Sequence, residues 1–382
     1  MANIENYIEK YGNLTLNEEP FNNVDNLILS NLSYLVFRGA VPEIDYRKKS
    51  LISKLSSIIG LSNKINTITI KDAVYKMNFN INEKENIRVK QDIDMTKKLA
   101  DSKRFGNMLL TCYIDEYDEN IEIQFSAITI LMEDNTAYVA YRGTDTTLIG
   151  WKEDFNMSFM EKIPAQAEAL KYLLQVASII KQPLRIGGHS KGGNLAVYAS
   201  MYAGSKIQNR IINIYNNDGP GFQLHVLETN EYKAVKNKII TIIPQTSIVG
   251  MLLEHEEDYI VVKSNETLIM QHDPYSWEVD GCKFVIMENT TDSSKIIDKT
   301  LSQWLNTMSM EQREKFVDIL WDILGATKVK TFPELVDKFV ENTMKIKKAY
   351  SNLDPQSKEI LSNTFSALFK SAKDVIAKNY FK

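Results

Sequence analysis

The residues of this chain that are most able to do chemistry lie at 187–194, which reads GGHSKGGN. A strand-like run at 184–186 precedes this segment, and a helix-like run at 195–199 follows it. A serine with a glycine two residues away on each side, on a sharp strand-to-helix turn, is typical of a nucleophile elbow, where only small residues fit at those two positions. Ser190 is therefore the candidate nucleophile. The alternative is a glycine-rich loop that merely joins a strand to a helix. A phosphate-binding P-loop is excluded because glycine follows Lys191.

A serine hydroxyl is a weak nucleophile at neutral pH and requires a base within hydrogen-bond reach. Histidine is the usual base, and the chain contains four: His189, His225, His255 and His272. His189 directly precedes the serine, His225 lies where a helix is expected, and His255 lies in an acidic run that should be an exposed turn. His272 lies in a loop after the last expected strands, so it is the candidate base. The alternative for His272 is a loop histidine with only local hydrogen bonds.

A histidine base needs a carboxylate that orients its ring, and Asp218 is the candidate. The usual chain order places the acid after the serine and before the histidine. Asp218 follows the strand-like run at 211–215, at the sheet edge where Ser190 should emerge. Ligands bind at that edge in open α/β sheets. The alternative is an aspartate favoured only by the Gly219-Pro220 turn that follows it.

Acyl transfer also needs two N–H donors for the negative charge that develops on the carbonyl oxygen. One donor comes from the residue after the nucleophile, here Lys191, and the other from a loop after an earlier strand. Arg142-Gly143-Thr144 ends a strand-like run, so the N–H of Thr144 is the candidate second donor. Its hydroxyl could add a further hydrogen bond.

Strands and helices alternate around these residues, which predicts an α/β fold with a mostly parallel sheet and helices on both faces. Residues 25–37 have helical spacing and should pack on the sheet, whereas the charged segment 80–104 is expected to be a surface excursion. A helix is predicted at 165–180. Strand-like runs lie at 122–131, 136–142, 184–186, 211–215, 238–243 and 258–263.

The strand signal ends beyond residue 297. We therefore expect a domain over residues 1–296 and an all-helical region over 297–382. The apolar faces of its helices should pack on each other or on the sheet domain. The alternative is contact with a partner or a membrane surface. Helix starts are predicted at Ser309-x-x-Gln312, Thr331-x-x-Glu334 and Asp354-Pro355.

The composition of the 382-residue chain is that of an ordinary globular protein, with 44% hydrophobic and 25% charged residues. The net charge of −4 does not favour nucleic-acid binding. Cys112 and Cys282 are too few for a disulfide framework and lack the spacing of a metal site. The N-terminal residues do not resemble a secretory signal, and no run of about 18 apolar residues predicts a membrane span. We therefore expect a cytoplasmic protein.

Three ordered motifs resemble the class 3 lipases, a branch of the α/β-hydrolases: residues 138–144 (YVAYRGT), Trp151-x-x-Asp154-Phe155, and residues 188–193 (GHSKGG). The resemblance is closer to a poorly characterised group of bacterial lipase-like proteins that share a GHSKGGN elbow. It implies the α/β-hydrolase fold, Ser190 as nucleophile and Thr144 as oxyanion residue. The turn and strand at 255–260 resemble those that precede the base in these lipases, which leaves His272 in the base position.

The chain departs from the lipases at the acid. Lipases carry Asp-x-Val-Pro after the strand that here is 238–243, whereas this chain has Ser247 and the residues Ile-Val-Gly at that place. Asp218 would replace the missing acid, because some α/β-hydrolases carry it after the preceding strand. Asp273 and Asp258 are the reserve candidates.

The lipases also cover their site with a short amphipathic lid, and residues 146–151 (TTLIGW) are apolar enough for that part. The alternative is that Leu148, Ile149 and Trp151 are core residues. We expect an ion pair between Arg142 and Asp154 to hold this loop.

These inferences predict a serine esterase or lipase that cleaves a small-molecule or lipid ester through Ser190, His272 and Asp218, without a metal or an organic cofactor. Two alternatives stay open. One is an acyltransferase or thioesterase with the same triad. The other is a hydrolase-fold binding module with weakened catalysis, which Ser247 at the usual acid position favours.

Overall fold

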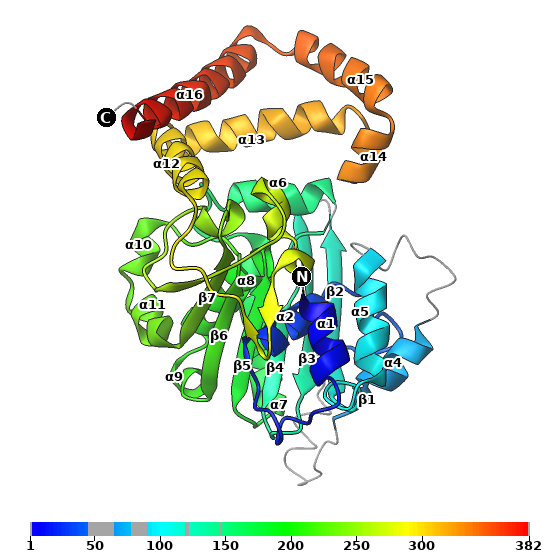
Figure 1. Cartoon of the computed structure of the whole chain (residues 1–382). Helices are drawn as coiled ribbons and strands as arrows, with labels where there is room; N and C mark the ends of the chain where they lie inside the picture. Colours follow the sequence, from blue (N-terminus) through cyan, green and yellow to red (C-terminus); the bar gives the residue numbers. More distant parts are fainter. Residues whose placement is uncertain (1, 45–64, 78–89, 119–121, 146, 381–382) are drawn as a thin grey trace.

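The centre of the protein is an eight-stranded sheet whose strands β1–β8 follow one another in chain order (Figure 1). The computed structural model describes residues 2–44, 65–77, 90–118, 122–145 and 147–380. Neighbours are antiparallel from β1 to β4 and parallel from β4 to β8. The strands are β1 (Ile68–Thr69), β2 (Leu109–Asp118), β3 (Ile123–Leu131), β4 (Ala137–Tyr141), β5 (Leu184–His189), β6 (Ile211–Asn217), β7 (Ile239–Pro244) and β8 (Tyr259–Val262). A separate hairpin joins β9 (Val279–Asp280) to β10 (Lys283–Phe284).

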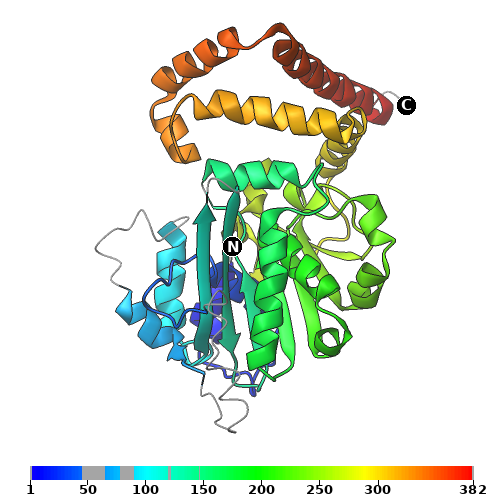
Figure 2. The same cartoon turned by 180° about the vertical axis from the view of Figure 1, so that it is seen from behind.

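Helices cover both faces of this sheet and bury a separate apolar core on each (Figures 1 and 2). The alternation of a strand explains the two cores: Tyr138 and Ala140 of β4 belong to one, and Val139 and Tyr141 to the other. The helices α1 (Ile4–Tyr11), α2 (Asn23–Leu32), α4 (Ile70–Lys76) and α5 (Lys90–Asp101) border the first core, and α7 (Pro164–Ile179), α8 (Lys191–Tyr202) and α11 (Asn230–Val235) border the second. The mostly parallel sheet with helices on both faces is the predicted α/β-hydrolase fold.

All six strand-like runs of the sequence are strands of this sheet, and the helix predicted at 165–180 is α7. The helix expected at 25–37 is α2, which ends earlier, at Leu32. Strand β2 was not among the predicted strands. It pairs with β3 along nearly its whole length and thereby places a second antiparallel strand beyond β4.

The expectation of a surface excursion at 80–104 is wrong for the part that the structure describes, and residues 80–89 lie outside that part. Helix α5 buries Met95 and Leu99 in the first core. The side chain of Arg104 is fully buried and lies 2.5 Å from the equally buried Asp25 of α2. A charged residue can be buried when a partner neutralises it, so the charges of this segment did not indicate exposure.

The C-terminal region is helical, as expected, and lies beyond the edge at which the parallel strands end (Figure 1). Ser309 forms the predicted capping box with Gln312. Phe316, Val317, Ile323 and Leu361 form a small core of their own. The first helix begins at Asp292 and so continues across the predicted boundary at 296. The helices are α12 (Asp292–Asn306), α13 (Met310–Gly325), α14 (Phe332–Asp337), α15 (Phe339–Asn352) and α16 (Pro355–Tyr380).

Some apolar side chains of these helices face solvent, among them Phe339 (67% exposed) and Phe369 (73% exposed). Contact of this region with a partner or a membrane surface therefore stays a prediction. In the part of the chain that the structure describes, no helix combines the length and the apolar character that crossing a membrane requires.

Candidate active site

Ser190 lies on a sharp turn between β5 and α8, with backbone angles of φ 58° and ψ −135°. A positive φ is unfavourable for a residue with a side chain, so the surroundings must hold this turn. The N–H of Ser190 donates to the carbonyl oxygen of Asn217 at 2.9 Å, and its carbonyl oxygen accepts from the N–H of Gly193 at 2.9 Å. A Cβ at Gly188 would lie 2.6 Å from the carbonyl oxygen of Tyr141 and closer still to the first turn of α8. The turn therefore has the strain and the small neighbours of a nucleophile elbow.

The structure brings His272 and Asp218 together at the same edge of the sheet. The Nδ1 of His272 lies 2.7 Å from Oδ2 of Asp218. Asp218 follows β6 with a positive φ of 51°. Its side chain is fully buried, whereas that of His272 is 23% exposed. A carboxylate at Nδ1 favours the tautomer with its proton on that nitrogen, which leaves Nε2 able to accept a proton.

Ser247 takes part in this arrangement although it cannot be an acid. Its Oγ donates to Oδ1 of Asp218 at 2.5 Å, and the N–H of Gly250 donates to the same oxygen at 3.1 Å. Both oxygens of the buried carboxylate are thus hydrogen-bonded. Of the reserve candidates, Asp273 accepts from the N–H of Tyr275 at 3.2 Å and begins a short helical turn, and Asp258 is exposed.

His189 supports the candidate base through the backbone, a role that the sequence analysis did not assign. Its Nε2 lies 2.9 Å from the carbonyl oxygen of His272, and the two rings are 4.5 Å apart. A carbonyl oxygen only accepts, so Nε2 of His189 is the donor. In the neutral ring, its Nδ1 then accepts from the hydroxyl of Tyr34 at 3.0 Å. The position of His189 beside Ser190 was the available signal for such a role.

The loop after β4 lies directly against the serine. A Cβ at Gly143 would stand 3.0 Å from Cβ of Ser190, so glycine is required where the two segments meet. The next residue, Thr144, donates its hydroxyl to Oδ2 of Asp154 at 2.6 Å. Lys191 is the first residue of α8, and the N–H groups of a first helical turn have no partner within the helix. Both candidate oxyanion residues thus lie beside Ser190.

The side chain of Lys191 forms a buried ion pair behind the elbow. Its Nζ lies 2.6 Å from Oε2 of Glu153, and both side chains are fully buried. The same ammonium donates to the carbonyl oxygen and the side-chain oxygen of Gln124 at 3.1 and 3.0 Å. Glu153 belongs to α6 (Leu148–Asn156), which also carries Asp154. The ion pair therefore joins the nucleophile elbow to the helix that holds Thr144.

The expected ion pair between Arg142 and Asp154 is wrong. Arg142 lies 2.9 Å from Asp115 of β2, a strand that the sequence analysis had not found. Asp154 instead accepts the hydroxyl of Thr144. Burial raises the pKa of Asp154 to about 6, although the nearby charge of Lys191 and the Thr144 hydrogen bond act in the opposite direction.

The segment considered as a lid is the start of α6, and Thr146 lies outside the described residues. Leu148 is buried, whereas Trp151 is 37% exposed. The C-terminal region contacts the backbone of this helix through the loop after α13 and through α13 itself. The N–H of Leu148 donates to the carbonyl oxygen of Lys330 at 2.8 Å, and its carbonyl oxygen accepts from the indole of Trp321 at 2.9 Å.

The two remaining histidines lie elsewhere. His225 is in α10 (Leu224–Leu227), as expected for a helix. His255 is not in an exposed turn: its side chain is only 7% exposed and lies 3.2 Å from Glu257. Burial alone would raise the pKa of Glu257, but the hydrogen bond and charge of His255, with hydrogen bonds from Thr241 and Tyr232, lower it to about 2.

Comparison with solved structures finds similarity to lipases at low identity. The chain is 15% identical to the Rhizomucor miehei lipase propeptide complex, with a TM-score of 0.31, and covers 57% of that chain with 41% of its own. It is 14% identical to M37 lipase, with a TM-score of 0.34, and the match covers 59% of this chain and 68% of the other. It is 13% identical to a triacylglycerol lipase whose catalytic centre is a serine protease triad, with a TM-score of 0.34, and the match covers 53% of this chain and 84% of the other. TM-scores this low do not establish a shared fold, so the fold assignment depends on the sheet and the turn described above.

No curated protein matches the chain. A sequence profile of the Mbeg1-like family, however, matches residues 99–322, which is more than half of the 382 residues. The matched segment contains Thr144, Ser190, Asp218 and His272. The expected relation to lipase-like proteins is confirmed at this level, and membership in the narrower bacterial group stays a prediction. The chain belongs to the Mbeg1-like family.

Proposed function

We propose that this protein is a serine esterase or lipase with Ser190 as nucleophile, His272 as base and Asp218 as acid. The observation that carries the proposal is the 2.7 Å contact between Asp218 and Nδ1 of His272, at the edge of the sheet where Ser190 stands on its strained turn. A buried carboxylate, a partly exposed imidazole and a serine held at positive φ are the parts that acyl transfer requires.

In the proposed reaction, Oγ of Ser190 attacks the ester carbonyl carbon while its proton passes to Nε2 of His272. Asp218 stabilises the imidazolium that forms, and the N–H groups of Thr144 and Lys191 stabilise the negative carbonyl oxygen. When the tetrahedral intermediate collapses, the alkoxide leaves with the proton from His272. Water, deprotonated by His272, then attacks the acyl-enzyme and releases the carboxylic acid and free Ser190.

The hydrogen bond from Thr144 to Asp154 supports this assignment because it fixes the oxyanion loop. With its hydroxyl held at 2.6 Å by a buried carboxylate, Thr144 cannot rotate its side chain freely. A preorganised donor needs no rearrangement when charge develops, and a single oxyanion donor typically contributes about 3–4 kcal/mol at the transition state.

A fluorophosphonate probe and a series of p-nitrophenyl esters of increasing acyl length test the proposal. The wild-type protein should be labelled once and should hydrolyse at least part of the series. Ser190→Ala should abolish both reactions. Ser178→Ala is a matched control, because Ser178 is an exposed serine of α7 whose hydroxyl donates to the carbonyl oxygen of Gln175.

Turnover that survives in Ser190→Ala, or a wild-type protein that neither labels nor hydrolyses any ester, would contradict the proposal. The same assay run with an acyl-CoA and with an added alcohol acceptor separates the esterase from a thioesterase and an acyltransferase. Preferential release of free thiol, or transfer of the acyl group to the alcohol, would replace the esterase assignment.

A further inference from the structure

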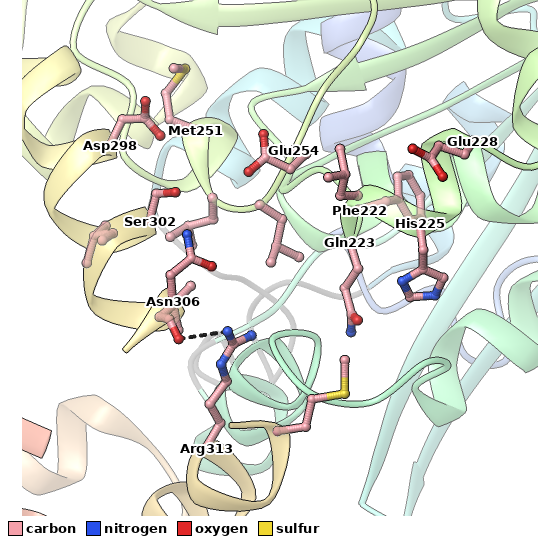
Figure 3. Close-up of a pocket in the computed structure, with 16 residues that line it drawn as sticks. Phe222, Gln223, His225, Glu228, Met251, Glu254, Asp298, Ser302, Asn306 and Arg313 are labelled. Carbon is pink, nitrogen blue, oxygen red and sulfur yellow. Dashed lines mark hydrogen bonds between the residues drawn. The ribbon is translucent and has the colours of Figure 1, made fainter. Parts of the chain in front are cut away.

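A pocket of about 500 Å³ lies between the hydrolase body and the C-terminal helices (Figure 3). The loops that follow Asp218 and Gly250 form one wall, and α12 with the start of α13 forms the other. Its volume lies within the range of sites that hold small molecules. Neither Ser190 nor His272 lines it. Half of its lining residues are apolar: Phe222, Leu224, Met251, Leu252, Leu253, Leu301, Leu305 and Met310.

Three carboxyl groups line this pocket, and two of them, Glu254 from the body and Asp298 from α12, lie on the same side, with Glu228 farther along the wall of the body (Figure 3). Burial raises the pKa of Asp298 and the neighbouring charge of Glu254 raises it further, whereas the charges of His255 and Lys299 act in the opposite direction. The flanking ion pairs join Lys236 to Glu256 and Lys295 to Asp292. Among the described residues, no ion pair involves Glu254 or Asp298, so neither carboxyl group is in direct contact with a cation, although His255 and Lys299 lie near enough to Asp298 for their charges to act on it.

Arg313 lies on the opposite side of the pocket (Figure 3) and has a structural function. Its two terminal nitrogens donate to the carbonyl oxygens of Ser158 and Leu305, at 2.5 and 2.7 Å. The guanidinium thereby joins α13 to the end of α12 and to the loop after α6. With its terminal nitrogens engaged in this way, Arg313 is not arranged to receive an anionic head group in the bidentate manner that arginine usually adopts.

We propose that this pocket binds an amphiphilic cation, that is, a single alkyl chain that ends in an ammonium group. The chain would lie against Phe222, Leu301 and Leu305, and the ammonium would lie between Glu254 and Asp298. An apolar lining favours the chain through the area that it removes from water. The charge on one side then distinguishes ammonium from alcohol and carboxylate heads. The proposal does not depend on the hydrolase reaction, since the pocket does not contain the candidate triad.

Three probes of equal chain length, octylammonium, octanol and octanoate, test the proposal by isothermal titration calorimetry on the full chain at neutral pH. None of them is an ester, so none is consumed. We expect octylammonium to bind about tenfold more tightly than octanol, because a charge-assisted contact replaces a neutral one. Octanoate should bind more weakly than octanol.

Asp298→Asn and Glu254→Gln should each reduce the preference for octylammonium over octanol to about twofold or less. The matched control is Asp292→Asn, which removes a carboxylate from the same helix where the side chain is 89% exposed and outside the pocket. It should keep the tenfold preference. Equal or tighter binding of octanoate, absence of binding by all three probes, or an unchanged preference in both pocket variants would each overturn the proposal.

Discussion

Replacing Asp218 with asparagine should inactivate the protein by trapping His272 in the wrong tautomer. One oxygen of Asp218 receives two donors, the hydroxyl of Ser247 and the N–H of Gly250, and the other faces Nδ1 of His272. Asparagine has one oxygen and one NH2 group to place. The hydroxyl can rotate to become an acceptor, but the N–H of Gly250 cannot. The amide oxygen should therefore stay toward Ser247 and Gly250, with the NH2 group toward His272.

An NH2 group opposite Nδ1 forces that nitrogen to accept, so the ring proton moves to Nε2. The imidazole then cannot take the proton of Ser190. The same exchange in a serine protease triad lowers kcat about 10⁴-fold, which corresponds to roughly 5 kcal/mol of activation free energy. We expect a loss of that size in kcat on the best p-nitrophenyl ester and in the rate of fluorophosphonate labelling. KM should change little, because Asp218 does not face the substrate.

Asp273→Asn is the matched control, since Asp273 is the next residue after His272 and its side chain accepts the backbone N–H of Tyr275, which asparagine can also accept. It should keep at least about half of the wild-type rate. Thermal unfolding of both variants checks that they fold. A folded Asp218→Asn protein with near-normal kcat would refute the tautomer argument and remove Asp218 from the triad.

Three further outcomes are expected. Gly188→Ala should lower the free energy of unfolding, measured in urea, by at least about 3 kcal/mol, because its Cβ would meet backbone atoms that cannot move aside. Gly325→Ala adds a Cβ in open space, so it should change the free energy of unfolding by less than about 1 kcal/mol. Lys191→Met should lower the free energy of unfolding by about 3–5 kcal/mol, since it leaves the buried Glu153 unpaired. Adding Glu153→Gln should recover part of that loss, and no recovery would show that the ion pair is not the cause. The pKa of Asp154, raised to about 6, means that the folded state holds a proton that the unfolded state releases between about pH 4 and 6, so wild-type stability falls as pH rises through that window. The stability of Asp154→Asn relative to wild type should accordingly increase by up to about 3 kcal/mol from pH 4 to pH 7, and a difference that does not vary with pH would contradict this reasoning.

The turn at Ser190 could be anticipated from sequence because its requirements are local. Gly188 is two residues before the serine in the chain and meets atoms of the adjacent strand and helix, so its identity reports the steric limits directly. The strand and helix on either side of the turn were equally visible from their apolar runs. His272 could be reached by elimination, since the chain has only four histidines.

Partners that are distant in sequence could not be found in the same way. Strand β2 contains a bulge between Thr111 and Ile114, where Cys112 has a φ of 54°. The bulge interrupts the alternation that indicates a strand. Because β2 was missed, so was Asp115, the true partner of Arg142. Likewise, nothing local in the sequence joins Arg104 to Asp25.

The support of Asp218 by Ser247 was also hidden, because the sequence indicated only that an expected aspartate was missing. Asp218 follows β6, and Ser247 lies shortly after the end of the neighbouring strand β7. The hydrogen bond between them therefore depends on the parallel register of β6 and β7. A residue that suggested weakened catalysis in the sequence therefore contributes a hydrogen bond to the proposed acid.

The left-handed backbone at Ser190 affects the choice of an inactive form for ligand studies. Glycine would relax at φ 58° and ψ −135°, where an L side chain is strained by about 1–3 kcal/mol. Exchange to glycine would therefore remove the hydroxyl and also allow the turn to loosen, and a crystal grown with a slowly cleaved ester could then show a displaced loop. Alanine keeps the Cβ and therefore the backbone strain of the wild-type turn, so it is the better substitute for trapping an intact substrate.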